Sequence, residues 1–449
     1  MHDADAARPE TPATPWRSWY ALGLLFVTYV FNFIDRSILG ILAQPIKEDL
    51  GLTDTQMGFM GGIAFAIFYT FLGIPIARLA DRTVRRNVLA VCVGIWSAMT
   101  AVCGLAQNFV QLLLARIGVA VGEAGGSPPA HSMISDLFPP QTRATALAIY
   151  ALGIPVGSMF GNLAGGWINE AFDWRTAFMV VGLPGIALAL IVRFTLREPV
   201  RGASENLALS DEPPPPVAEV FRYLWAKRSF RYLALGGALH AFVGYGVGFW
   251  IPAFFIRTHD MGTAQLGQWL FFLGFAGMAG TLLGGWMADR LARRDFRWYV
   301  WLPGLATALS VPFSAAVYLL PDYRVALLIA IVPGILGSYY LGPTFALTQG
   351  LVGLRMRALA SSILLFILNL IGMGLGPQAT GIISDLLAAT PVGSESLRWA
   401  LLIVLMFNLI STGFYLLAGR HLREDMASRP PDALAAAAVP APLRAKGAA

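Results

Sequence analysis

Hydrophobic residues of this chain gather in long runs that alternate with short polar segments. A helix needs about 20 mostly apolar residues to cross the hydrocarbon core of a membrane. Because several runs are longer than that, we expect tilted or curved helices. The pattern predicts an all-α membrane protein with twelve transmembrane helices, at residues 18–44, 55–78, 87–107, 109–135, 142–170, 175–196, 230–257, 264–288, 297–319, 324–349, 356–386 and 396–419.

The longest internal polar segment divides these runs into two groups of six. Residues 198–228 contain four consecutive prolines, Pro213 to Pro216, followed by basic residues. We interpret this segment as a cytoplasmic linker. It would join an N-terminal six-helix half, residues 17–197, to a C-terminal six-helix half, residues 229–422. The N-terminus, residues 1–16, and the Ala/Pro-rich tail, residues 423–449, are expected to be disordered and cytoplasmic.

The composition agrees with a chain that lies mostly in lipid. Of the 449 residues, 56% are hydrophobic and only 13% are charged, and the mean hydropathy is +0.63. Soluble domains carry about 25% charged residues. The first apolar run opens near Trp19 and lacks a cleavage site, and it is longer than the apolar core of a signal peptide. We therefore interpret it as the first transmembrane helix.

Basic residues occupy alternate loops, which predicts the orientation of the chain. The net charge of +6 does not indicate nucleic-acid binding, because these residues lie in short loops between apolar runs. Loops rich in Lys and Arg stay in the cytoplasm. We therefore expect a multi-pass protein of the plasma (inner) membrane with both termini inside. The arginine-rich loops hold Arg78, Arg82, Arg85, Arg86, Arg143, Arg290, Arg293, Arg294, Arg297, Arg355 and Arg357.

A charged motif occurs twice, at matching places in the two halves. The second run is followed by Ala80-Asp81-Arg82 and then Arg85-Arg86, and the eighth by Ala288-Asp289-Arg290 and then Arg293-Arg294. This repeated ADRxxRR pattern resembles the major facilitator superfamily over nearly the whole chain. The resemblance implies two six-helix halves in a pseudo-twofold arrangement. Departures are Ala77, Val84 and Ala292, which stand where the family usually has glycine.

Three further motifs resemble the spinster-like group of that superfamily. They are Asn32 to Arg36 in the first run, Gly122 to Pro128 in the fourth, and Ser135 to Phe138 at its end. The group is known for exporting lipids and sphingolipids. Carriers of sugar acids and other organic anions share part of the pattern.

Four charged residues lie within the apolar runs. Asp35 and Arg36 are in the first run, and Arg116 and Glu123 are in the fourth. Charges inside a membrane are costly and usually functional. At 1.5 Å per residue, Asp35 and Arg116 reach overlapping depths, which predicts an Asp35–Arg116 ion pair.

These residues suggest proton coupling. We expect Asp35 and Glu123 to be the proton sites, with Arg36 and Arg116 as charge partners that also bind the substrate head group. The cluster is neutral when both acids are ionised, so protonation would make it positive and favour an anion. The alternative is a static ion pair that joins the two helices.

The resemblance places the first, fourth, seventh and tenth spans around a central cavity. The seventh and tenth spans are rich in aromatic residues and poor in charge, which would suit the apolar part of an amphiphile. Ordinary packing or lipid-facing aromatic residues are the alternative. The candidate lining residues are His131, Tyr245, Phe249, Tyr339, Tyr340, Thr344 and Asn369.

The repeated loop motif is expected to act in gating. In the family, the motif aspartate caps a helix start in the opposite half, which would bring Asp81 near Arg355. Arg82 or Arg85 would pair with Asp136. The second copy consists of Asp289, Arg290 and Arg293, and lacks an acid at the end of the tenth span, so its relay should be weaker. The alternative is that the arginines only fix topology.

Several classes of protein are disfavoured by the motifs. The three lysines, Lys47, Lys227 and Lys446, match no phosphate-binding loop. The histidines and the two cysteines show no metal-binding spacing. No nucleophile–base set indicates an enzyme. We therefore expect no cofactor, no metal and no catalytic activity.

The sequence thus favours a proton-coupled secondary transporter of amphiphilic, anionic, lipid-like substrates of the lysolipid or sphingolipid type, working by alternating access. One alternative is a proton symporter of hydrophilic organic anions or sugar acids on the same fold. Another is a non-transporting membrane receptor or scaffold. We expect the partners to be protons, a small amphiphile and membrane lipids, with no nucleic acid, and the chain to be a monomer.

Overall fold

The regular structure is helical throughout the described part of the chain. The computed structural model describes residues 15–202, 216–353 and 356–428, and these ranges contain helices without strands. Twelve helical stretches are long and apolar enough to cross a membrane, which confirms the predicted fold class. They are Trp16–Ile41, Asp54–Arg82, Arg85–Cys103, Phe109–Leu137, Gln141–Ala171, Trp174–Thr195, Arg228–His259, Thr263–Ala292, Trp298–Leu319, Tyr323–Gly350, Arg357–Ala388 and Gly393–Ala427.

These spans form two compact units that differ from the two halves of the sequence. Within the described chain, the first unit holds residues 15–52, 64–202 and 261–272, and the second holds the rest. The start of the second span therefore packs with C-terminal helices, and the start of the eighth packs with N-terminal ones. The predicted boundaries at 17–197 and 229–422 do not include this exchange of two short segments.

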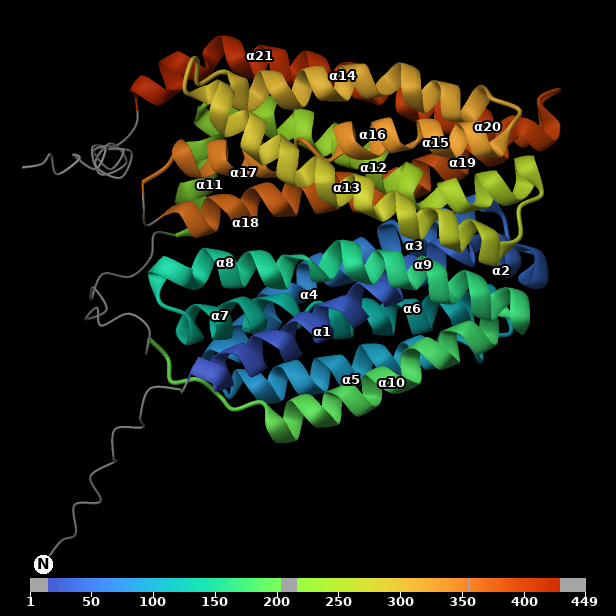
Figure 1. Cartoon of the computed structure of the whole chain (residues 1–449), viewed down its shortest axis with the longest axis horizontal. Coiled ribbons are helices and arrows are strands. Elements are labelled where there is room, and N and C mark those ends of the chain that lie inside the picture. Colours follow the sequence, from blue (N-terminus) through green and yellow to red (C-terminus); the bar gives the residue numbers. More distant parts are fainter. Residues whose placement is uncertain (1–14, 203–215, 354–355, 429–449) are drawn as a thin grey trace, which may run out of the picture. The chain divides into compact units, whose positions relative to one another are not determined.

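In the first unit, α1 packs along α9, and α5 packs against both α6 and α10 (Figure 1). Side chains cap two of these helices: Asn108 accepts a hydrogen bond from the Gln111 N–H, and Asp173 accepts one from the Thr176 N–H. The helices are α1 (Pro15–Ile41), α2 (Ala43–Leu50), α4 (Ile63–Arg82), α5 (Arg85–Cys103), α6 (Phe109–Glu123), α7 (Ser127–Leu137), α8 (Pro140–Ala151), α9 (Gly153–Ala171) and α10 (Trp174–Thr195).

In the second unit, α12 packs against α21, α19 and the π-helical stretch η2. Glycine permits this approach, because a Cβ at Gly376 would collide with the backbone of Phe242. The elements are α3 (Asp54–Gly61), α11 (Val217–Ala226), α12 (Arg228–His259), α13 (Thr263–Ala292), α14 (Trp298–Leu319), α15 (Tyr323–Ile329), α16 (Ile331–Gly337), α17 (Leu341–Gly350), α18 (Arg357–Leu368), η2 (Asn369–Leu375), α19 (Gly376–Ala388), η3 (Gly393–Glu395), α20 (Ser396–Leu405) and α21 (Phe407–Ala427).

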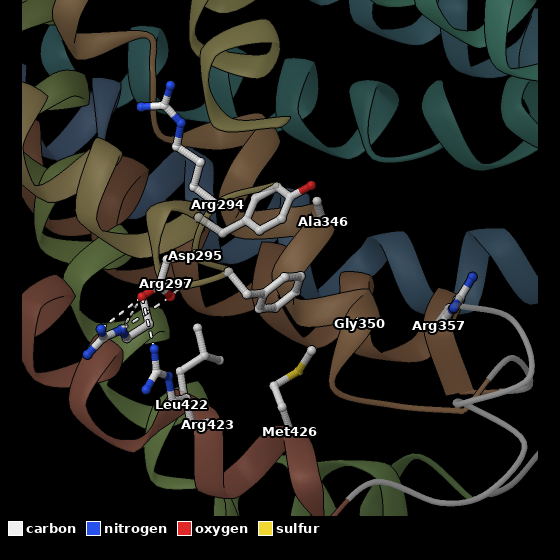
Figure 2. A pocket seen from close by; sticks show the side chains of 11 residues that line it. Arg294, Asp295, Arg297, Ala346, Gly350, Arg357, Leu422, Arg423 and Met426 are labelled. Atoms are coloured by element: carbon white, nitrogen blue, oxygen red, sulfur yellow. Dashed lines mark hydrogen bonds and ion pairs between the residues drawn. The ribbon is translucent and has the colours of Figure 1, made fainter. Parts of the chain in front are cut away.

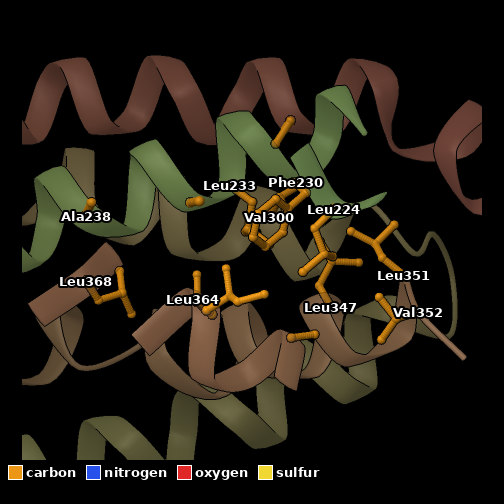
Figure 3. Close-up of a cluster of buried hydrophobic side chains, with 14 of the residues drawn as sticks. Leu224, Phe230, Leu233, Ala238, Val300, Leu347, Leu351, Val352, Leu364 and Leu368 are labelled. Carbon is orange, nitrogen blue, oxygen red and sulfur yellow. The ribbon is translucent and has the colours of Figure 1, made fainter. Parts of the chain in front are cut away.

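The predicted linker contains a helix that belongs to the second unit. Val220 and Leu224 of α11 are fully buried in a hydrophobic cluster with Phe230, Leu233 and Leu347 (Figure 3). Burying such apolar side chains is worth about 1.5–3 kcal/mol each, which fixes the helix to the bundle. The second part of the segment 198–228 is therefore a structural element of the C-terminal half.

Helical structure extends into both terminal segments that were predicted to be disordered. The helix α21 continues to Ala427, so the prediction of disorder from residue 423 is wrong for its first residues. At the other end, α1 already begins at Pro15, within the segment predicted as 1–16. Residues 1–14 and 429–449 lie outside the described residues.

Candidate functional site

The two charged residues of the first span lie next to each other on α1 but differ in exposure. Asp35 is buried, with 1% of its surface exposed, whereas 17% of the Arg36 side chain is exposed. Successive residues of a helix point about 100° apart, so one helix presents a buried acid and a partly accessible base side by side.

The two charged residues of the fourth span share one face of α6. Arg116 and Glu123 are seven residues apart, about two helical turns, and both are buried. The helix ends at Glu123, because Gly125 and Gly126 and then Pro128 interrupt it before α7. Glu123 is therefore held at a break in the span.

The ion pair that forms differs from the one predicted. Arg36 Nε lies 2.6 Å from Glu123 Oε2. Arg116 Nη1 instead donates to the backbone carbonyl of Asp35, at 3.3 Å. The predicted Asp35–Arg116 ion pair is therefore wrong among the described residues. The Arg116 guanidinium reaches the backbone of α1, and no arginine of the described residues lies within ion-pair distance of the Asp35 carboxylate.

The cluster keeps unused hydrogen-bonding capacity. Asp35 Oδ1, Glu123 Oε1 and Arg116 Nε are buried and have no hydrogen-bond partner among the described residues. Leaving a buried polar group unpaired costs about 1–3 kcal/mol, and more when it is charged. The two carboxylate oxygens are suited to take up a proton or to accept a hydrogen bond, and the Arg116 N–H is suited to donate one to a ligand.

Aromatic rings surround the arginines. The Arg36 guanidinium lies 4.4 Å from the Tyr69 ring centre, 5.0 Å from Phe33 and 5.2 Å from Phe65. Arg116 lies 5.5 Å from Phe65. These are cation–π distances. The sequence reasoning missed Phe65 and Tyr69, although their spacing of four residues on α4 puts them on one helix face.

A series of ring contacts, one stacked and two edge-to-face, connects this cluster to His131. Phe33 packs on Tyr29 at 5.2 Å, Tyr29 stacks on Tyr150 at 4.3 Å, and Tyr150 meets His131 at 5.2 Å. His131 itself is exposed on α7. Its exposed position within the first unit agrees with the proposed lining role, which remains a prediction.

The first copy of the loop motif forms a dense polar network. Arg85 pairs with Asp136 at 2.5 Å and with Glu198 at 2.7 Å. Of the two arginines predicted to reach Asp136, Arg85 makes the contact, while Arg82 is exposed. Glu198 comes from the segment predicted as linker, so sequence reasoning missed it.

The motif aspartate of the first copy is exposed. Its backbone carbonyl, with those of Ala80 and Thr83, accepts hydrogen bonds from Arg201. The predicted neighbour of Asp81, Arg355, lies outside the described residues. The capping role of the Asp81 carboxylate therefore stays a prediction.

The second copy of the loop motif makes fewer polar contacts than the first, and its role in gating stays a prediction. Asp289 accepts a hydrogen bond from the Tyr299 hydroxyl at 2.8 Å, and Arg290 lies over the Trp286 ring. Arg293 is exposed. Within the described ranges these three residues make no ion pair, since the tenth span ends without an acid.

The lining residues predicted in the second unit divide into two groups. Tyr245 is 40% exposed, and Phe249, Tyr340 and Asn369 are partly exposed. Two others are too buried to line an open surface. Tyr339 packs against α13 and α14, and Thr344 is fully buried within hydrogen-bond distance, 3.2 Å, of the Tyr415 hydroxyl. We correct these two assignments, because the residues pack between helices.

A buried histidine in the second unit was missed. His240 Nε2 lies 2.8 Å from the Gly337 carbonyl oxygen, which only accepts, so this nitrogen carries a proton. Its Nδ1 lies 3.1 Å from Asn408 Oδ1 and 3.3 Å from Thr307 Oγ1. His240 thus links four spans, and its only signal in the sequence was a histidine in the middle of an apolar run.

A second missed cluster fixes α3 within the second unit. Arg257 donates two hydrogen bonds to the Asp54 carboxylate, both at 2.7 Å, and Ser384 donates a third at 2.6 Å. Asp385 accepts from the backbone N–H groups of Asp54 and Thr55. An acid at a helix N-terminus is stabilising, so α19 and α12 together hold the start of the second span.

The first unit contains a similar arrangement at the start of the eighth span. The Glu170 carboxylate at the end of α9 accepts from the backbone N–H of Ala264 at 2.8 Å. Asn169 donates to the Thr263 hydroxyl, and this hydroxyl donates to the Gly166 carbonyl. The second and eighth spans therefore both begin at a carboxylate supplied by another span.

Comparison with known proteins agrees with this geometry. The chain is 35% identical over 414 residues to an MFS-type efflux pump of Mycolicibacterium smegmatis, covering 92% of this chain and 95% of that protein. It is 26% identical to the hexuronate transporter of Bacillus subtilis, with 80% and 86% covered. The crystal structure of a bacterial homologue of the human lysosomal transporter Spinster, inward-facing and unoccupied, superimposes with a TM-score of 0.85 at 34% identity, covering 92% of this chain and 99% of that one.

The family model that matches this chain covers most of its length. Residues 25–377 match the model of the Major Facilitator Superfamily, and this range includes both copies of the loop motif and the whole charged cluster. The similarity to the bacterial Spinster homologue agrees with the motifs in the first and fourth spans. The chain therefore belongs to the Major Facilitator Superfamily and is similar to its spinster-like members.

Proposed function

We propose that this chain is a proton-coupled secondary transporter of amphiphilic, anionic, lipid-like substrates that works by alternating access. It would lie in the plasma membrane with both termini in the cytoplasm. The observation that carries the proposal is the buried network of Asp35, Arg36, Arg116 and Glu123. Among the described residues, the network contains one close ion pair and three polar atoms without a hydrogen-bond partner. A protein that only bound partners at the membrane would gain nothing from such a costly cluster.

The charges of the network determine how a proton and an anion affect each other. With both acids ionised the four charges cancel, and one proton makes the network positive. Protonation of Glu123 would remove the counter-ion of Arg36. The partly exposed Arg36 guanidinium could then pair with an anionic head group. The proton and the anion therefore favour each other's binding, and two ligands that bind cooperatively to one site move in the same direction.

Aromatic surface in the second unit supports an amphiphile. Tyr245 is exposed on α12, and the neighbouring glycines Gly244 and Gly248 have no atoms within 4 Å of an added Cβ. From Tyr232 to Ile256 the helix carries no Asp, Glu, Lys or Arg. Such a surface offers contacts to a hydrocarbon chain and none to a second charged group.

The two carboxylate-capped helix starts support alternating access. Asp385 holds the start of α3, and Glu170 holds the start of α13. Each contact joins a residue of one sequence half to a residue of the other. If the two sequence halves rock against each other, both contacts must break and reform. We expect the Arg85–Asp136 network to act as a gate at the arginine-rich end.

Substrate counterflow in proteoliposomes tests the substrate class without needing a gradient. Vesicles loaded with an unlabelled lysophospholipid should take up the labelled compound faster than vesicles without protein. Excess hexuronate should not compete. Competition by hexuronate and none by lysophospholipid would reject the amphiphile.

A proton symporter of sugar acids is the second candidate. The similarity to the hexuronate transporter favours it, and a sugar acid would supply the anion that the network binds. For a sugar-acid symporter, hexuronate should compete in the counterflow experiment and lysophospholipid should not. Transport should depend on Glu123 in the same way as for the amphiphile transporter.

A further inference from the structure

The helix α11 carries an apolar stripe that the described residues of the second unit leave exposed. Val217, Phe221 and Trp225 recur every four residues, which places them along one side of the helix. They are 57%, 42% and 38% exposed. The rings of Phe221 and Trp225 stack at 5.5 Å and form a continuous surface. The neighbouring side, with Val220 and Leu224, is buried in the hydrophobic cluster (Figure 3), so the stripe has a fixed orientation.

The position of α11 in the chain brings this stripe close to the membrane surface. The helix ends at Ala226, and the seventh span, α12, begins at Arg228. Lys227 between them has an extended backbone, with φ −76° and ψ 120°, so the chain turns at this point. Because α12 is long and apolar enough to cross a membrane, a helix joined to it through one residue lies near the level where the span leaves the lipid. An apolar stripe at that level can be buried at the boundary between head groups and acyl chains.

The polar side of α11 and the first turn of α12 are basic. Arg222 and Arg228 are exposed, and neither forms an ion pair with a described residue. Basic side chains at the cytoplasmic surface are attracted to anionic lipids. Residues 217–231 contain one acid, Glu219, and four basic residues, Arg222, Lys227, Arg228 and Arg231.

Two other arginines at this end of the second unit already have an acid partner. Arg297 and Arg423 pair with Asp295, at 2.8 Å and 3.1 Å, and Figure 2 shows these three residues together at the wall of a cavity. At α11, by contrast, unpaired arginines lie beside an exposed apolar stripe. Topology alone does not explain this combination, because keeping a loop in the cytoplasm requires positive charge but no exposed aromatic rings.

We propose that α11 is an interfacial helix that binds the anionic lipids of the cytoplasmic leaflet. The stripe of Val217, Phe221 and Trp225 enters the boundary between head groups and acyl chains, where aromatic and apolar side chains are favoured. Arg222 and Arg228 contact the negatively charged head groups. This role rests on the proposed cytoplasmic placement of the arginine-rich end, and it is independent of the substrate and of proton coupling.

Fluorescence quenching in vesicles tests this contact on the full chain. A dansyl group at Phe221→Cys should be quenched strongly by lipids with brominated acyl chains and weakly by acrylamide in the water. Ala226 lies about 140° away around the helix, on its polar side. At Ala226→Cys, acrylamide should therefore quench several-fold more than at Phe221→Cys. The native cysteines, Cys92 and Cys103, are buried, and the chain without an added cysteine measures any labelling of them.

The same label at position 221 measures the choice of head group. Brominated phosphatidylglycerol should quench it more efficiently than brominated phosphatidylcholine at equal mole fraction. Each basic side chain near an anionic surface strengthens attachment about fivefold, so Arg222→Gln/Arg228→Gln should reduce this preference about fivefold or more. Arg222→Lys/Arg228→Lys keeps both charges and should retain the preference. Arg423→Gln, at an arginine that already pairs with Asp295, should also leave it unchanged.

Results of three kinds would overturn the proposal. Equal quenching of the two labelled positions by acrylamide would place the stripe in water. Protection of position 221 from both quenchers would mean that another part of this chain, or a second protein, covers the stripe. A lipid preference that is absent, or that survives Arg222→Gln/Arg228→Gln, would show that the arginines do not select anionic lipids. None of these measurements involves transport, so they stay valid whichever substrate the chain moves.

Discussion

Arg36 is held both by an acid and by aromatic rings. Its Nε pairs with Glu123, while Tyr69, Phe33 and Phe65 present their rings to the guanidinium. When Glu123 is protonated the rings would keep the guanidinium in place, because cation–π attraction does not depend on the acid. This combination gives Arg36 a fixed position with a replaceable counter-ion.

Substitution of Tyr69 tests this role of the rings. Tyr69→Leu should raise the KM for substrate about two- to thirtyfold, because a cation–π contact is worth about 0.5–2 kcal/mol. Tyr69→Phe keeps the ring and should stay near the wild-type KM. Initial uptake rates over a range of substrate concentrations measure both. Equal effects of the two substitutions would show that the ring does not position Arg36.

His240 should contribute to stability. His240→Ala leaves the Gly337 carbonyl and the Asn408 side chain without their buried partner, which costs about 1–3 kcal/mol. The unfolding midpoint in detergent, followed by tryptophan fluorescence, should fall. His421→Ala, at a ring stacked on Tyr232 near the end of α21, should change it little. An unchanged midpoint for His240→Ala would mean that the hydrogen-bonded network does not hold the four spans together.

At the scale of elements, the short helix α3 depends on distant partners. Asp54 is buried and pairs with Arg257, 203 residues away. Removing one member of a buried pair costs about 3–5 kcal/mol, because the other charge stays buried and unpaired. The exposed pair of Asp49 and Arg175 is worth only about 0–1 kcal/mol.

A double-mutant cycle compares these two pairs. Asp54→Asn should destabilise the chain more than Asp54→Asn combined with Arg257→Gln, which gives a large coupling energy. The matched cycle of Asp49→Asn and Arg175→Gln should give a coupling near zero. Thermal unfolding in detergent provides the values. Similar coupling energies for both pairs would show that the Asp54–Arg257 pair does not stabilise the position of α3 more than an exposed pair would.

The sequence was sufficient to locate the membrane spans, but it did not predict the breaks within them. Apolar runs locate a membrane helix because lipid demands about 20 apolar residues in a row. The breaks at Gly125 and Gly126 and the π-helical η2 depend on packing against other helices. The partners of Asp54 and His240 lie far away in sequence, so periodicity carries no information about them.

The charged network shows the same limit. Its members were predictable, because charges inside a membrane are rare. The pairing of each arginine with an acid was not predictable, because the depth of a residue along a helix does not determine how the helix is rotated about its own axis. Arg116 therefore contacts the backbone of Asp35 rather than its carboxylate.

At the scale of the whole molecule, the repeat in the sequence recurs in its contacts. The starts of the second and eighth spans are each held by a carboxylate, Asp385 or Glu170, from a span of the other sequence half. The two copies of the loop motif differ: among the described residues the first copy pairs with the acids Asp136 and Glu198, and the second makes no ion pair. The proposed proton-binding residues, Asp35 and Glu123, also lie in the N-terminal half. The proposed coupling residues and the loop network with acid partners therefore lie in the same half.

Uptake into proteoliposomes under an imposed pH gradient tests the central claim most directly. Wild-type protein should accumulate a labelled lysophospholipid when the outside is acidic, and should lose accumulation when the gradient is reversed. Glu123→Gln should still exchange substrate but no longer accumulate it, whereas Glu48→Gln, at an exposed acid of α2, should behave like the wild type. Undiminished gradient-driven accumulation by Glu123→Gln would contradict the assignment of proton coupling to the buried network.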